Sequence, residues 1–105
     1  MGDTNYFSGT VKILTNPIQH SIKERNLITL AWGEINQFRQ NNFVLLVFWG
    51  NLGTEVKEFY KRNDYILIEG YSSLKKTTLK LNQTIITGLK VYPLVLNSKT
   101  TVKKI

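Results

Sequence analysis

The stretch from Phe43 to Arg62 decides the fold: FVLLVFWGNLGTEVKEFYKR. Its first part, Phe43–Trp49, is apolar at every position, so a strand here must have both faces covered or use one face for binding. After Gly50-Asn51 the period changes, because the next apolar residues recur at helical spacing: Leu52, Val56, Phe59 and Tyr60. The stretch therefore predicts a strand followed by a helix that ends at Asn63-Asp64.

Four further β-rich runs flank this stretch: Tyr6–Leu14, Leu27–Ile35, Tyr65–Leu74 and Thr84–Leu96. Two polar segments between them are expected to be a hairpin loop, Asn36–Asn42, and a basic turn, Lys75–Leu81. The pattern predicts one all-β domain over residues 5–96, with a helix between strands three and four and a short basic tail at 97–105. This element order is that of the five-stranded OB-fold (oligonucleotide-binding) barrel.

The composition gives no basis for catalysis or for a metal site. The chain has no cysteine and one histidine, His20, so neither a thiolate nucleophile nor a zinc site can be assembled. Glu24, Glu34 and Glu69 lack the spacing of an acid–base pair, and no Gly-rich phosphate loop or nucleophile elbow is present. We therefore expect a binding protein that uses no cofactor, not an enzyme.

The charge balance indicates a polyanionic partner. The 14 Lys and Arg residues exceed the 7 Asp and Glu residues and give a formal net charge of +7, which favours nucleic acid or an anionic membrane surface. A solvated basic surface without a partner would have the same composition. The longest apolar run is Phe43–Trp49, far short of the ~20 residues of a membrane span, and Met1–Tyr6 lacks a signal-peptide pattern. We expect a soluble intracellular protein.

The stretch from Phe43 resembles the bacterial single-stranded DNA-binding protein family, in which an aromatic-rich strand ends in aromatic-Gly before a Leu-led helix. Three other pieces resemble the family's strands in the same order: Tyr6-Phe-Ser-Gly-Thr-Val11 followed by Asn16-Pro17, Leu27-Ile-Thr-Leu-Ala31, and Tyr65-Ile-Leu-Ile-Glu-Gly70. The first piece also resembles primosomal replication protein B, a close relative. The similarity covers Asn5 to Leu74, and the composition resembles short, diverged members encoded in plastid genomes of some algae.

The resemblance implies an OB fold and sequence-tolerant binding of single-stranded DNA in replication, repair or recombination. It also implies a homo-oligomer, either a dimer or a tetramer, and a plastid location, with the bacterial cytoplasm as the alternative. Two features depart from the family pattern. The sequence ends without a Gly/Pro-rich linker and acidic tip, so recruitment of replication proteins by that route is not expected. Thr77 stands where the family usually has an aromatic residue.

Two aromatic residues of the third predicted strand are the first candidates for stacking on bases. Phe43 and Trp49 are six residues apart, hence on one strand face and about 20 Å apart. They match the positions of the family's stacking aromatics. Leu45 and Val47 lie between them, where the family often has a basic residue. The alternative is that both aromatics belong to the core or to its rim.

Trp32 is a third candidate of a different kind. It shares strand parity with Ile28 and Leu30, which we interpret as core residues, so its register argues for burial. A bulge or a strand end would release it, and Trp is rarely buried completely. Phe38, in the expected hairpin loop, is a weaker candidate.

Basic residues are the candidates for phosphate contacts. A basic group lies in the turn that OB domains use against oligonucleotides: Lys75, Lys76 and Lys80. The other candidates are scattered: Lys12, Lys23, Arg25 and Arg39. Any one of them can equally be a solvated surface charge.

Two other functions stay open from the sequence. The apolar row from Phe43 to Trp49 could be the interface of an OB-fold protein-interaction or structural module. The same surface could also bind RNA, which would require recognition of the 2′-hydroxyl group.

Overall fold

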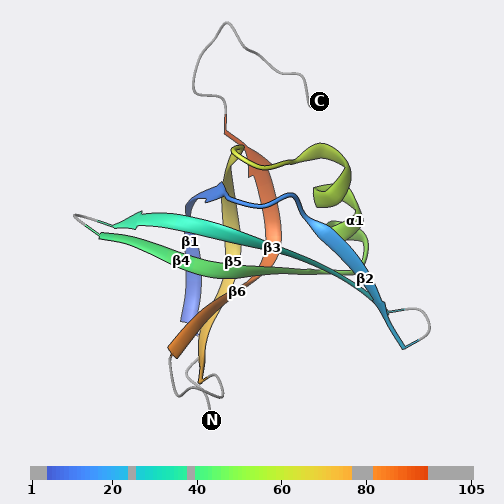
Figure 1. Cartoon of the computed structure of the whole chain (residues 1–105), viewed down its shortest axis with the longest axis horizontal. Helices are drawn as coiled ribbons and strands as arrows, with labels where there is room; N and C mark the ends of the chain where they lie inside the picture. Colours follow the sequence, from blue (N-terminus) through green and yellow to red (C-terminus); the bar gives the residue numbers. More distant parts are fainter. Residues whose placement is uncertain (1–4, 24–25, 38–39, 77–81, 95–105) are drawn as a thin grey trace, which may run out of the picture.

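The computed structural model describes residues 5–23, 26–37, 40–76 and 82–94, and it shows a strongly curved β-sheet with one helix (Figure 1). The described elements follow one another as β1 (Asn5–Ile13), β2 (Ile18–Ile22), β3 (Asn26–Gln37), β4 (Gln40–Trp49), α1 (Gly50–Phe59), β5 (Tyr65–Lys76) and β6 (Asn82–Pro93). The predicted β class with a single helix after the apolar strand is confirmed for this part of the chain.

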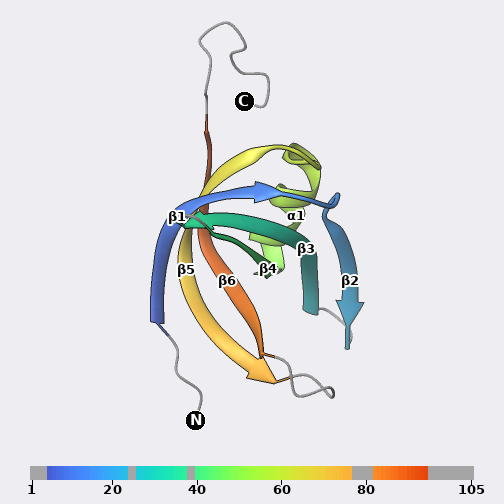
Figure 2. The same ribbon diagram turned by 60° about the vertical axis from the view of Figure 1, so that its left-hand side comes forward.

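The strands are joined into a closed ring. Their order in the sheet is β1-β5-β6-β4-β3-β2, and β1 also pairs with β3, with Lys12 opposite Glu34 and Ile13 opposite Gly33. This last pairing closes a ring of β1, β5, β6, β4 and β3, while β2 extends the sheet beyond β3 (Figure 2). All pairings are antiparallel except that of β4 with β6.

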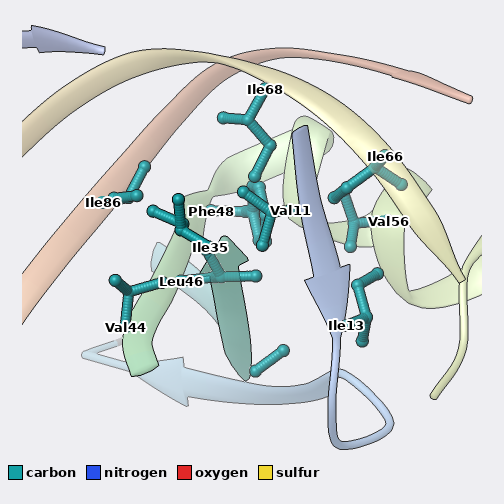
Figure 3. Packing of buried hydrophobic residues seen from close by; sticks show 11 residues of the cluster. Val11, Ile13, Ile35, Val44, Leu46, Phe48, Val56, Ile66, Ile68 and Ile86 are labelled. Atoms are coloured by element: carbon teal, nitrogen blue, oxygen red, sulfur yellow. The ribbon is translucent and has the colours of Figure 1, made fainter. Parts of the chain in front are cut away.

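The interior of the ring is filled by alternate residues of the strands. Figure 3 shows the aliphatic side chains converging on Phe48, and the fully buried ones come from four strands and the helix: Val11, Ile13, Val44, Leu46, Val56, Ile66, Ile68 and Ile86. Each buried side chain of this size contributes roughly 1.5–3 kcal/mol. Because successive residues of a strand point to opposite faces, burial of the even-numbered residues of β4 fixes its odd-numbered residues on the outer side.

The helix begins directly after β4, at Gly50. Gly50 has a φ of 63°, a left-handed conformation that glycine adopts without steric cost. Gly53 and Val56 are buried, and Leu52 and Tyr60 pack against the core. Phe59 is exposed, so its predicted place on the apolar helix face is wrong. The helix buries the side with Gly53 and Val56, where Thr29 and Phe48 leave no room for a Cβ atom at residue 53, and Phe59 in the last turn lies beside this side, not on it.

The predicted fold needs correction in three places. The strand β2 was not predicted, and it makes six strands among the described residues, so that the helix lies between β4 and β5 and not after a third strand. Asn36–Asn42 is mostly not a loop, since β3 reaches Gln37 and β4 begins at Gln40. Lys75 and Lys76 belong to β5 and not to a turn. Residues 77–81 and the tail at 97–105 lie outside the described residues.

Candidate functional site

The outer side of the β3–β4 ladder carries the predicted aromatic residues. Opposed residues of an antiparallel ladder point to the same side of the sheet. The register places four such pairs of described side chains on the outer side: Ile28 opposite Trp49, Leu30 opposite Val47, Trp32 opposite Leu45, and Glu34 opposite Phe43. We call the surface formed by Trp32, Phe43 and Trp49 the aromatic face.

All three rings of the aromatic face are open to solvent. Phe43 is 62% exposed, Trp49 50% and Trp32 42%. Between them Leu45 is half-buried and Val47 is buried, so they form an apolar floor. Phe43 and Trp49 are about 20 Å apart along β4, and Trp32 is a diagonal neighbour of Phe43, at about 7–8 Å between Cα atoms. The two β4 aromatics are therefore not core residues.

The predicted parity of β3 is wrong. The residues that line the interior are Thr29, Ala31, Gly33 and Ile35, whereas Ile28 and Leu30 are half-buried on the outer side and Trp32 is exposed. The reason is the space inside the ring, where the side chains of β1 and β4 already meet. Small residues of β3 fit there, and its large ones face outward.

The aromatic face has no fixed positive charge of its own. Neither β3 nor β4 contains a lysine or an arginine. Glu34 is half-buried, opposite Phe43 on one side and Lys12 on the other. The Lys12 Nζ lies 5.8 Å from the centroid of the Tyr65 ring, a cation–π distance. The face is therefore suited to flat, uncharged partners, and phosphates would have to be neutralised from neighbouring elements.

Two of the predicted cations lie at the end of β5. Lys75 and Lys76 are exposed there, beside the first residues of β6. Lys75 points to the same side of β5 as Ser73, two residues earlier. Ser73 pairs with Ile85 of β6, and Ile85 pairs with Leu45 of the aromatic face's floor, so all four lie on one side of the sheet. Lys75 therefore shares the outer side of the sheet with the aromatic face, whereas Lys76 has the opposite parity.

Of the other described candidates, Lys12 lies on the outer side beside the aromatic face, opposite Glu34 and diagonal to Trp32, with its Nζ over the Tyr65 ring. Lys23 is exposed just beyond the end of β2. Four candidates lie outside the described residues: Arg25, Phe38, Arg39 and Lys80.

The structure also exposes apolar and aromatic residues that sequence reasoning missed. Ile18 and Ile22 of β2 are exposed on the outer side. On β1 and β5, the Tyr6 and Tyr71 rings form an edge-to-face pair with centroids 6.4 Å apart. The alternation around Ile66 and Ile68 already carried the signal for Tyr71, since it puts residue 71 on the outer side.

Two features are absent from the part of the chain that the structure describes. It contains no group of three or more His, Asp or Glu side chains that could hold a metal ion. It also contains no helix of the length and apolarity needed to cross a bilayer.

The sequence of the chain is similar to that of a known protein. The chain is 32% identical over 104 residues to a Trieres chinensis protein named "Putative single-stranded DNA-binding protein ycf41", with 90% of this chain and 92% of the relative covered. No family model matches the sequence.

Two solved structures have the same fold. The second single-stranded DNA-binding protein (SSBb) of Mycobacterium smegmatis matches with a TM-score of 0.72 at 17% identity, over 98% of both chains. The single-stranded DNA-binding protein of Thermus aquaticus matches with a TM-score of 0.73 at 14% identity, over 89% of this chain and 41% of the other. The ring of strands with its helix is therefore an OB fold of this type.

Proposed function

The chain belongs to the single-stranded DNA-binding protein family, and from this premise we propose that it binds single-stranded DNA without regard to base sequence. The observation that carries the proposal is the exposure of Phe43 and Trp49 on one outer face of β4. Members of this family are typically binding proteins and not enzymes.

Stacking and charge have separate tasks in this proposal. Each base stacked on an aromatic ring contributes about 1–3 kcal/mol, whatever the base, because every base has a π-face. Lysines that neutralise phosphates release counterions and make binding weaken with salt. Phe43 and Trp49 supply the stacking, and Lys75, which shares the outer side of the sheet, would hold a phosphate together with the neighbouring Lys76 at the end of β5. Lys12, Lys80, Arg25 and Arg39 stay predictions.

Titration of the protein with oligo-dT tests the proposal, with tryptophan fluorescence and anisotropy of a labelled oligonucleotide as readouts. We expect quenching and tight binding that weaken as salt rises, and little response to duplex DNA. Replacement of both aromatics, Phe43→Ala with Trp49→Ala, should weaken binding by a few kcal/mol while the fold is retained, because both residues are exposed.

A matched control has aromatic residues removed outside the aromatic face. Tyr6 and Tyr92 are 63% and 41% exposed on β1 and β6, so Tyr6→Ala with Tyr92→Ala removes comparable exposed rings. This control should bind oligo-dT like the wild type. Equal binding by the wild type and the folded Phe43/Trp49 double variant would remove the proposed site.

A protein-interaction module is the second candidate, and one observation favours it. The floor of the aromatic face is Leu45 and Val47, and β3 and β4 contribute no positive charge. If this face binds protein, oligo-dT should leave the tryptophan emission unchanged at every salt concentration. Oligo-U compared with oligo-dU tests RNA binding, since these strands differ only in the sugar and a preference for oligo-U would indicate recognition of the 2′-hydroxyl group.

Assembly, process and location stay predictions from the family resemblance. A homo-oligomer, dimer or tetramer, is tested by sedimentation of the free protein. A role in replication, repair or recombination is predicted because proteins of this family bind the single strands that these processes expose. A plastid location rests on the similarity in composition to algal plastid-encoded members.

A further inference from the structure

Trp32 lies on the same outer face as Phe43 and Trp49 but on a different strand. Its partner across the ladder is Leu45, which lies between the other two aromatics on β4. Its Cα atom is therefore about 7–8 Å from that of Phe43. Phe43 and Trp49 are about 20 Å apart along β4, and the Trp32 ring lies on the neighbouring strand at a level between them.

The crowded interior of the ring holds Trp32 on the outside. Its neighbours Ala31 and Gly33 both point inward and are buried. A Cβ atom at Gly33 would lie 2.7 Å from the Val11 Cγ1 and 2.9 Å from the Leu46 Cδ1, so even a methyl group needs a displacement there. A shift of register by one residue would put the indole into this space. The outward orientation is therefore built into β3.

The backbone at Trp32 is fixed as well. Its N–H donates to the Thr15 Oγ1 at 3.0 Å, and its carbonyl oxygen accepts from the Leu14 N–H at 2.8 Å. Both bonds are made away from β4, so Trp32 and Leu45 form a non-hydrogen-bonded pair, in which cross-strand side chains lie closest. Trp32 thus combines a fixed backbone and an apolar neighbour with an exposed ring.

The surroundings of Trp32 favour a base over a phosphate. Glu34 is the next residue of β3 on the same side, and its carboxylate repels anions. β3 and β4 contain no lysine or arginine. The nearest described cation is Lys12 of β1, opposite Glu34, and its Nζ lies over the Tyr65 ring at 5.8 Å from the centroid. What the position offers to a ligand is the exposed indole itself, and indoles stack on nucleobases.

We propose that Trp32 is a third base-stacking platform, so that the aromatic face holds bases across both strands of the hairpin and not only along β4. The inference rests on the proposed function and extends it. It predicts that Trp32 contributes to affinity as much as one stacked base, about 5- to 150-fold.

The two tryptophans permit a direct test, since each can be made the sole reporter. In Trp49→Phe the emission comes from Trp32 alone, and saturating oligo-dT should quench it; in Trp32→Phe it comes from Trp49. Anisotropy of a labelled oligo-dT measures affinity independently. We expect Trp32→Ala to bind about 5- to 150-fold more weakly than the wild type and Trp32→Phe to recover most of the loss.

Tyr92→Ala is the matched control, because Tyr92 on β6 is 41% exposed against 42% for Trp32; it should bind like the wild type. The inference is overturned if Trp49→Phe binds oligo-dT by anisotropy without any change in Trp32 emission, or if folded Trp32→Ala binds within twofold of the wild type. Absence of binding by the wild type itself is a different result, since it would overturn the proposed function together with this inference.

Discussion

At the scale of single residues, Gly33 of β3 is tightly packed beneath the aromatic face. A methyl group there meets Val11 and Leu46 at distances that require one of them to move. We expect Gly33→Ala to lower the free energy of unfolding by about 1–3 kcal/mol, the usual cost of overpacking a core, measured by urea denaturation. Ser8→Ala, at an exposed position of β1, is the control. An unchanged urea midpoint for Gly33→Ala would show that β3 can move away from its neighbours.

The same packing explains which site residues could be predicted from sequence. Phe43 and Trp49 were predicted to share one strand face, because they have the same parity, and both are exposed. For Trp32 the predicted register favoured burial. The alternation of residue types along β3 shows which residues share a face of the strand, but it does not show which face is the inner one. That choice depends on the volume left by other strands, here by Val11 and Leu46 at Gly33. The sequence of β3 alone does not reveal how much room the other strands leave inside the ring.

At the scale of elements, the end of α1 gives a pH-dependent prediction. Burial, and then the negative charges of Glu55 and Asp64, raise the pKa of the Tyr60 hydroxyl above its ordinary value of 10.0. A raised pKa in the folded state means that the neutral form is favoured by folding. This stability is complete below pH about 10 and is lost as pH rises through the folded pKa.

Urea denaturation of the wild type and of Tyr60→Phe at pH 8 and at pH 10.5 measures this effect. The free energy of unfolding should fall more between these values in the wild type, because Phe has no proton to lose. Glu55→Gln should lie between the two, since it removes one of the charges that raise the pKa. Parallel pH profiles for wild type and Tyr60→Phe would mean that the hydroxyl titrates alike in folded and unfolded chains.

The strands that contribute many core residues were located well from the sequence, whereas the strand segments outside the core were missed. The alternation in Tyr65–Leu74 predicted Ile66 and Ile68 as inward residues, and both are fully buried. β2 was missed because it is a short edge strand, with four of its five residues exposed. The ends of β3 and β4 were read as a loop because they are polar. Backbone pairing beyond the core, as between Gln37 and Gln40, needs no apolar side chains and leaves no apolar pattern.

At the scale of the whole molecule, the described lysines and arginines lie on other elements than the strands of the aromatic face. The chain carries a formal net charge of +7, yet β3 and β4 hold none of its lysines and arginines. Lys75 and Lys76 lie at the far end of β5, whereas α1, with Lys57, lies at the other end of the molecule (Figures 1 and 2). Stacking and phosphate contact should therefore respond independently to mutation.

The dependence of oligo-dT affinity on salt separates the two contributions. On single strands the slope of log K against log salt is about −0.7 per phosphate contact, so Lys75→Ala with Lys76→Ala should make it shallower by up to about 1.4 and leave the quenching at saturation intact. Phe43→Ala with Trp49→Ala should lower the affinity for oligo-dT by the same factor at every salt concentration and leave the slope unchanged. The charge-matched control is Lys57→Ala with Lys61→Ala, both exposed. If it flattens the slope equally, net charge attracts the strand and the end of β5 makes no specific phosphate contact.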